Sequence, residues 1–356
     1  MKHYCLAFIG VVFGILRVEA CPAVNATPFQ RFQQRQFDVV VFFRVFKSGS
    51  STFMGALRRS KGHPSEYGRA FNVTFVEDRL DGTLQGEPRG WKGWASLRAR
   101  CPGDIWLFGH WHSWDSNPDL AKLLQPVPRK RVVHLTMFRE PSIWLRSVYS
   151  HAWQNTDHGR AKQPFLKWLM GTVNEARSPQ SGLRRLTMDY LRMFPHDLSD
   201  VFFEVVQRFR FGEDFVEARK TSPRGATLVP PTRAMAVTAL LSIDYKALDC
   251  HLRSNVLTLI TEFHNTSLAL LGYVLTGSTT ALLPSVNKAT GDHFKTWEHP
   301  SLIPPFIMGE NTTAQSFMQQ WAMFAPVLAP FEAVYGIAVA VFSDMVKEAT
   351  ASGAQF

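Results

Sequence analysis

One short cluster has the residue types and spacing to bind an anion. Residues 47–52 read KSGSST and follow the apolar run VVVFF at 39–43. A turn between a strand and a helix leaves backbone N–H groups unpaired, and these favour a negatively charged group. Lys47 adds a compact positive charge and Gly49 lets the backbone approach a ligand. The hydroxyl donors of the cluster are Ser48, Ser50, Ser51 and Thr52. The cluster predicts an oxyanion-binding turn; the alternative is an ordinary set of N-capping hydroxyl residues.

The order of these residues differs from the loop of nucleoside-triphosphate hydrolases. In that loop the lysine follows the glycines, as G-x-x-x-x-G-K-[ST], whereas Lys47 precedes Gly49. The sequence also shows no clear second acidic strand for magnesium. A nucleotide kinase is therefore a weaker prediction than another kind of anion-binding protein.

A second pair of residues is suited to binding phosphate. Arg139 follows the strand-like run RVVHLTMF at 131–138, and an arginine there can hold a phosphate bidentately. Ser147 comes eight residues later, two turns into a helix predicted over 141–153, and adds a hydroxyl donor. The alternative for Arg139 is a salt bridge with a neighbouring acid such as Glu140.

Two histidines are candidates for a general base. His110 and His112 occur in WLFGHWHSWD, after a short predicted strand. Histidine has an unperturbed pKa near neutrality, as deprotonation of a hydroxyl requires. Strand-like alternation would turn both to one face; two surface histidines on a loop are the alternative. His134 lies within a strand and is expected in the core.

A basic and aromatic segment is a candidate acceptor surface. The segment RGWKGWASLRAR at 89–100 includes Trp91, Lys92 and Arg98. Tryptophan faces stack on sugar rings, and the basic side chains suit an anionic glycan. A solvated basic face explains the segment equally well. The formal net charge of +10 also favours an anionic ligand or polymer.

Strands and helices alternate along the chain. Strands are expected at 37–46, 104–111, 131–140 and 255–263, and helices at 50–60, 141–153, 164–220, 244–254, 266–275 and 313–348. Residues 61–103 are rich in glycine, proline and charge, and we expect loops with short elements there. The first strand is apolar throughout, which is typical of a parallel strand covered on both faces. This order predicts a three-layer α/β domain, with a central parallel sheet flanked by helices.

The two ends of the chain are apolar for different reasons. Residues 1–20 combine a basic start, a 13-residue apolar run and small residues before Cys21, which predicts a cleaved signal peptide or else a short signal anchor. A linker over 21–36 and a single domain over 37–350 follow. The apolar stretch 324–342 contains Glu332 and two prolines, so a packed helix is expected rather than a membrane span.

Sequons and cysteines agree with a secretory route. N-x-S/T sequons occur at Asn25, Asn72, Asn265 and Asn311. Of the four cysteines, Cys5 would leave with the signal peptide, and a disulfide between Cys101 and Cys250 would leave Cys21 over. No Cys or His spacing in the sequence suggests zinc.

Three of these blocks resemble the Golgi carbohydrate sulfotransferases. VVVFFRVFKSGSSTF resembles their 5′-phosphosulfate loop, H-x-x-K-[ST]-[GA]-[GS]-[ST]-[ST], and LTMFREPSIWLRSVYSH resembles their 3′-phosphate motif, with Arg139 and Ser147 at its arginine and serine. NVLTLITEFHNTSLALL resembles a later strand and helix of the family, and the blocks keep the family's order over residues 38–275. The most similar members by pattern are the galactose 3-O and the heparan sulfate 2-O and 6-O sulfotransferases.

The resemblance implies a P-loop-like fold and a specific reaction. A sulfuryl group would pass in line from 3′-phosphoadenosine 5′-phosphosulfate (PAPS) to a sugar hydroxyl, with no metal. Lys47 would stabilise the leaving phosphate, and Gly109 with His110 matches the pair that carries the base in the 2-O enzymes; His112 remains the alternative base. The partners implied are a glycan, glycoprotein or glycolipid in the Golgi lumen and no nucleic acid. A catalytically inactive secreted protein that binds glycans or polyanions is the alternative function.

Three positions depart from the family pattern. Arg44 stands where the family has histidine, Phe46 replaces the common proline or histidine before the lysine, and Glu140 replaces aspartate. These changes put the acceptor specificity in doubt more than the binding of the donor.

Overall fold

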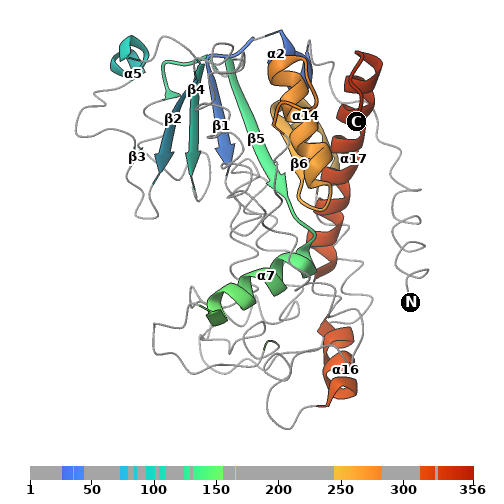
Figure 1. The fold of residues 1–356 in the computed structure, drawn as a ribbon. Helices are drawn as coiled ribbons and strands as arrows, with labels where there is room; N and C mark the ends of the chain where they lie inside the picture. Colours follow the sequence, from blue (N-terminus) through green and yellow to red (C-terminus); the bar gives the residue numbers. More distant parts are fainter. Residues whose placement is uncertain are drawn as a thin grey trace.

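The structure is a computed structural model of the chain (Figure 1). The part of the chain that it describes is residues 26–34, 36–43, 73–78, 84–85, 94–100, 104–109, 124–128, 131–154, 165, 244–282, 313–324 and 328–356.

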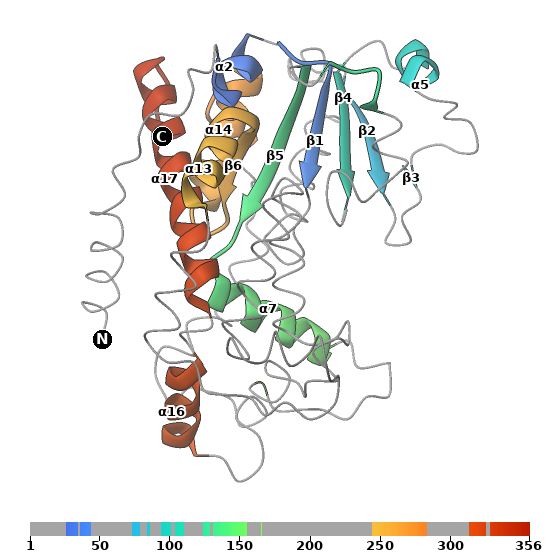
Figure 2. The same cartoon turned by 180° about the vertical axis from the view of Figure 1, so that it is seen from behind.

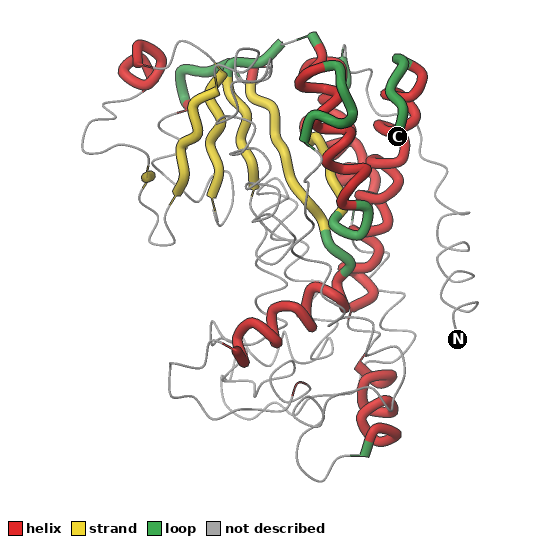
Figure 3. The backbone as a smooth tube through the Cα atoms, in the orientation of Figure 1, coloured by secondary structure: helices red, strands yellow, loops and turns green. Residues whose placement is uncertain are grey.

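The centre of the molecule is a six-stranded sheet with the order β3-β2-β4-β1-β5-β6. The strands are β1 (Val39–Phe43), β2 (Val73–Asp78), β3 (Leu84–Gln85), β4 (Asp104–Gly109), β5 (Val132–Phe138) and β6 (Val256–Ile260). The short β3 pairs antiparallel with β2, and every other neighbouring pair is parallel. The predicted α/β class with a parallel sheet is therefore confirmed, and Figure 3 shows the strands as one layer.

Burial explains why the strand sequences are so apolar. Val39, Val40, Val41 and Phe42 of β1 are fully buried, and all five residues of β6 are buried. A strand in a parallel sheet has neighbours in the sheet and layers on its faces, so alternation of polar residues is lost. The continuous apolar runs at 39–43 and 256–260 thus mark sheet strands.

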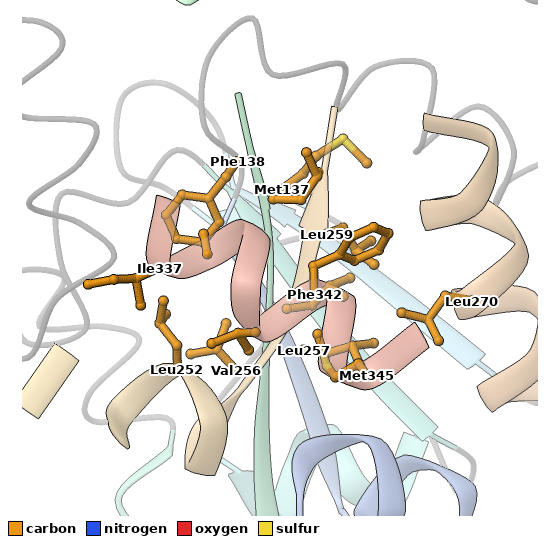
Figure 4. Close-up of a cluster of buried hydrophobic side chains, with 14 of the residues drawn as sticks. Met137, Phe138, Leu252, Val256, Leu257, Leu259, Leu270, Ile337, Phe342 and Met345 are labelled. Carbon is orange, nitrogen blue, oxygen red and sulfur yellow. The ribbon is translucent and has the colours of Figure 1, made fainter. Parts of the chain in front are cut away.

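Helices gather round β6 at one end of the sheet. They are α13 (Tyr245–Asn255), α14 (His264–Thr276) and α17 (Ala329–Ala351), all of which contact β6. The views from opposite sides agree on this arrangement (Figures 1 and 2). Their side chains meet those of β5 and β6 in one apolar cluster, which includes Phe138, Leu257, Leu270 and Phe342 (Figure 4).

Part of the expected linker over 21–36 is an ordered helix instead. Residues Pro28–Gln33 form α2, in which Phe29 and Phe32 are buried, and α2 contacts β5 and α14. Thr27 caps this helix, because its hydroxyl accepts from the Gln30 N–H at 3.2 Å. Two buried phenylalanines give this short segment enough apolar contact to pack on the core.

The stretch 61–103, expected to hold loops with short elements, also contributes a full strand to the sheet. The strand β2 lies next to β4 and in parallel with it, and α5 (Trp94–Arg100) follows further along the chain. β2 reads VTFVED, so only three apolar residues mark it.

The helix α17 is long and apolar enough to be a candidate membrane span, with a mean hydropathy of 1.4 in its most apolar window. In the structure it packs on β6 and α13, and Phe331, Val334 and Val341 are buried. Its polar side is engaged as well, since the Asp344 carboxylate pairs with Arg253 of α13 at 2.8 Å. These contacts favour the packed helix that the sequence predicts.

The described residues include one end of the expected disulfide. Cys250 on α13 is disulfide-bonded. The other three cysteines lie outside the described residues, so Cys101 as its partner stays a prediction. The signal segment 1–20 and the sequons at Asn25, Asn72 and Asn311 lie outside them too.

Candidate functional site

Three neighbouring parallel strands end at the same edge of the sheet. In the pairing register, Phe43 at the end of β1 is level with Gly109 at the end of β4 and with Thr136 of β5. The chain leaves β1 toward β2, on the β4 side of the sheet, whereas it leaves the neighbouring β5 toward β6 on the opposite side, so the direction of the connections reverses between β1 and β5. Open parallel sheets bind ligands at the carboxyl ends of the strands beside such a reversal.

Each of these strands leads directly into a segment that the sequence singled out. The segment 44–52 follows β1, His110 follows β4, and Arg139 follows β5. The topology thus brings the starts of all three segments to one edge. Most of the predicted site residues themselves lie outside the described residues: Lys47, Ser48, Gly49, Ser50, Ser51, Thr52, Trp91, Lys92, His110 and His112. Their roles stay predictions.

The described part of this edge is built around Arg139. Its side chain is 12% exposed, and its Nε lies 3.9 Å from Oε1 of Glu262, the second residue after β6. Burial lowers the pKa of Arg139, while the charges of Glu262 and Glu140 act against that shift. Arginine nevertheless keeps its proton in proteins, so the edge holds a fixed positive charge.

Glu140, the residue after Arg139, accepts hydrogen bonds from the residues that follow it. Its carboxylate accepts from the Ser142 N–H at 3.1 Å, the Ser142 hydroxyl at 2.8 Å and the Ile143 N–H at 2.8 Å. It therefore caps the first turn of α7 (Pro141–Gln154), where an acid is favoured by the helix dipole. Because Glu140 takes these N–H groups, an anion at this edge would be bound through Arg139 and not through the start of α7.

Glu262 is held from two sides. The Tyr335 hydroxyl of α17 donates to its Oε2 at 2.8 Å, and the Glu140 N–H donates to its Oε1 at 3.2 Å. Burial raises the pKa of Glu262, and these two hydrogen bonds, a third from its own backbone and the Arg139 charge oppose that shift. Burial also raises the pKa of Tyr335, so its hydroxyl remains a donor at neutral pH.

A third acid belongs to the same cluster. Glu332 lies one helical turn before Tyr335 on α17. Its side chain keeps contact with solvent, yet crowding by protein and the Glu140 charge raise its pKa to about 7. Among the described residues, no group of three or more His, Cys, Asp or Glu side chains is arranged to hold a metal.

Ser147 lies on the helix that starts beside Arg139. It is 9% exposed, on the second turn of α7. This helix runs below the carboxyl ends of the strands in Figure 1. The preceding residue, Arg146, lies over the Trp321 ring of α16 (Ala314–Phe324), 6.0 Å from the ring centre. Ser147 is thus held on a packed helix on the carboxyl-end side of the sheet.

Arg98 lies away from this edge. Its charge helps to lower the pKa of Asp38, whose carboxylate pairs with Arg131 at 2.7 Å. Asp38 and Arg131 directly precede β1 and β5, so they mark the amino edge of the sheet. The structure therefore does not bring Arg98, a candidate for acceptor binding, to the edge that holds Arg139.

Sequence reasoning did not identify Glu262, Glu332 or Tyr335 as residues of the site. Glu262 had a local signal, because an acid directly after a buried strand lies at the carboxyl edge. Tyr335 had none, since its helix reads as core. No family model matches the chain, and no curated protein matches it in sequence.

Proposed function

We propose that this protein is a PAPS-dependent carbohydrate O-sulfotransferase of the secretory pathway, with a three-layer, P-loop-like fold. The observation that carries the proposal is the topology of the sheet. The three segments with the phosphosulfate-loop, base and phosphate motifs follow the carboxyl ends of adjacent parallel strands β1, β4 and β5. In open parallel sheets, the loops that contact one nucleotide start from the same carboxyl edge of the sheet.

In the proposed reaction, each of these segments supplies a different group. An acceptor hydroxyl attacks the sulfur, its proton passes to His110, and the bond from sulfur to the bridging phosphate oxygen breaks. Lys47 stabilises the charge that builds on the leaving phosphate. Arg139 binds the 3′-phosphate, and Ser147 adds a donor from α7. The acceptor is a sugar hydroxyl on a glycan, glycoprotein or glycolipid in the Golgi lumen.

The burial of Arg139 supports its part in this scheme. A guanidinium that is 12% exposed binds an anion more strongly than one in water, because the surrounding protein screens the charge less. The disulfide at Cys250 supports the secretory location, since such bonds persist in oxidising compartments.

Calorimetric binding of 3′-phosphoadenosine 5′-phosphate (PAP), without magnesium, tests the donor site. We expect the wild type to bind, and Lys47→Ala and Arg139→Ala each to lose at least about tenfold in affinity, as befits a charge-assisted contact. Arg98→Ala is the matched control, since it removes an equal charge at the other edge, and it should bind normally.

If the wild type does not bind PAP, the sulfotransferase proposal is wrong, and the protein should be tested for glycan or polyanion binding alone. If it binds, transfer of labelled sulfate to a panel of glycans follows. His110→Ala should then bind PAP normally and transfer no label, while retained transfer would move the base to His112.

A further inference from the structure

We propose that Glu262 and Tyr335 are positioning residues for Arg139, and that Tyr335 of the C-terminal helix keeps Glu262 from competing with the 3′-phosphate of the donor. This inference rests on the proposed function and adds to it a part for α17, which carries none of the sequence motifs.

The contacts connect three elements into one chain. Arg139 follows β5, Glu262 follows β6, and Tyr335 comes from α17, 73 residues further along the sequence than Glu262. The Tyr335 hydroxyl donates to Oε2 at 2.8 Å, while Oε1 faces the Arg139 Nε at 3.9 Å. The two carboxylate oxygens therefore have separate partners, and the plane of the carboxylate is fixed.

The length of the contact to Arg139 is the informative quantity. At 3.9 Å the two charges attract, but the distance exceeds that of a hydrogen bond. An arginine and a carboxylate that are free to move would close to about 2.8 Å and form a bidentate pair. The hydrogen bonds from Tyr335 and from the Glu140 N–H hold Glu262 back from that position.

This arrangement suits a site in which a phosphate replaces the Glu262 carboxylate as the main partner of Arg139. Glu262 partly compensates the buried charge of Arg139 in the free protein, which a buried cation requires. It approaches from the Nε side, whereas the fork of the two terminal nitrogens lies on the other side of the guanidinium carbon. A carboxylate that closed to hydrogen-bond distance on this side would bind the Nε–H together with one terminal N–H, and would compete with the phosphate for that nitrogen.

Removal of the Tyr335 hydroxyl should therefore weaken phosphate binding through Glu262. In Tyr335→Phe the carboxylate loses the donor that holds its Oε2 and can close on Arg139. We expect the affinity for PAP to fall by about tenfold or more, the worth of one hydrogen bond to a charged group. The affinity for adenosine 5′-monophosphate, which has no 3′-phosphate, should stay unchanged.

A double-mutant cycle shows whether Tyr335 acts through Glu262. In Glu262→Gln the competing charge is absent, so adding Tyr335→Phe should no longer change the affinity for PAP. Tyr273→Phe is the matched control: it removes a hydroxyl that bonds to the Ser352 carbonyl, elsewhere on the same C-terminal segment, and should bind PAP as the wild type does.

Calorimetry of PAP and adenosine 5′-monophosphate on these variants, with melting temperatures measured in parallel, separates the outcomes. A wild type that binds no PAP overturns the proposed function and this inference together. A wild type that binds, with an unchanged ratio of the two affinities in Tyr335→Phe, overturns the inference alone. If Tyr335→Phe lowers the PAP affinity by the same factor in the wild type and in Glu262→Gln, the inference is overturned as well. Tyr335 would then act independently of Glu262.

Discussion

Replacing Ser267 by alanine should destabilise the turn that carries Glu262. The Ser267 hydroxyl is fully buried; it accepts from the Ile260 N–H at 3.0 Å and donates to the Ile260 carbonyl at 2.8 Å. Ile260 is the last residue of β6, and the next N–H, from Thr261, bonds to the Phe138 carbonyl of β5 at 2.8 Å. Successive residues of a strand direct their backbone N–H and C=O groups to opposite sides of the strand. Those of Ile260 therefore point away from β5, and Ser267 is their partner.

The expected cost follows from these two bonds. Each buried hydrogen bond contributes about 1 kcal/mol, and a buried N–H without a partner costs about 1–3 kcal/mol, so Ser267→Ala should lose about 2–3 kcal/mol. Ser267 also completes the sequon of Asn265. The comparison is therefore made in an Asn265→Gln background, in which neither protein carries a glycan at this position.

Urea unfolding followed by tryptophan fluorescence measures the difference. Thr280→Ala is the control, because it removes an exposed hydroxyl close to the end of α14 and should cost less than about 0.5 kcal/mol. If Ser267→Ala costs no more than this control, the two hydrogen bonds do not hold the turn and the reasoning fails.

Three further predictions concern α17 and α14. Crowding by protein and the Glu140 charge raise the pKa of Glu332 from 4.5 to about 7, so the folded chain holds this proton more tightly than the unfolded chain. The ionised carboxylate therefore lowers the stability of the fold increasingly as the pH rises from 4.5 to 7. Glu332→Gln should thus gain about 1 kcal/mol more at pH 8 than at pH 4.5 after allowance for solvent screening, and equal urea midpoint shifts at both pH values would contradict this. Gly272→Ala should lower the melting temperature by the equivalent of about 1–3 kcal/mol, because its Cβ would lie 2.9 Å from the Ser278 carbonyl oxygen; a higher melting temperature would show that helix propensity prevails. Asn265 is exposed, so in protein made through the secretory pathway Asn265→Gln should lower the mass by one glycan. Because the Ser267 hydroxyl of the same sequon is buried, the glycan must be attached before this turn folds. An unchanged mass in Asn265→Gln would contradict glycosylation at this position.

The strands with the strongest apolar signal could be predicted from the sequence. β1, β4, β5 and β6 lie within the expected strand ranges, because a parallel strand with both faces covered needs apolar residues throughout. β2 was harder to find, since its VTFVED run contains three apolar residues amid glycine, proline and charge. Its place in the sheet depends on pairing with β4, which lies far along the chain.

The helix α2 had a signal that composition concealed. Thr27 and Gln30 form a capping box, and Pro28 occupies the first helical position. The glutamines and arginines around them suggested a polar linker. The two phenylalanines decide the outcome, because they pack into the core and stabilise a helix too short to form alone.

In the site, too, some residues could be predicted from the sequence and others could not. Arg139 could be predicted because it lies between a recognisable strand and a recognisable helix. Glu262 and Tyr335 meet only because α17 packs beside β6, and a contact across 73 residues leaves no periodic pattern in the sequence. The acids that set the electrostatics of Arg139 thus depend on tertiary structure.

The two hypotheses for Arg139, a salt bridge and a phosphate contact, are physically compatible. At an effective dielectric constant of about 20, unit charges 3.9 Å apart attract by roughly 4 kcal/mol. A phosphate with about one and a half negative charges in bidentate contact at about 2.8 Å would attract by roughly 9 kcal/mol on the same scale. A phosphate can therefore replace the attraction of Glu262, and its advantage is largest while Glu262 stays at its present distance. If it closed to about 2.8 Å, the internal pair would strengthen to roughly 6 kcal/mol and remove about a third of that difference. The hydrogen bond from Tyr335 thus accounts for how an arginine with an acidic neighbour can still serve a phosphate.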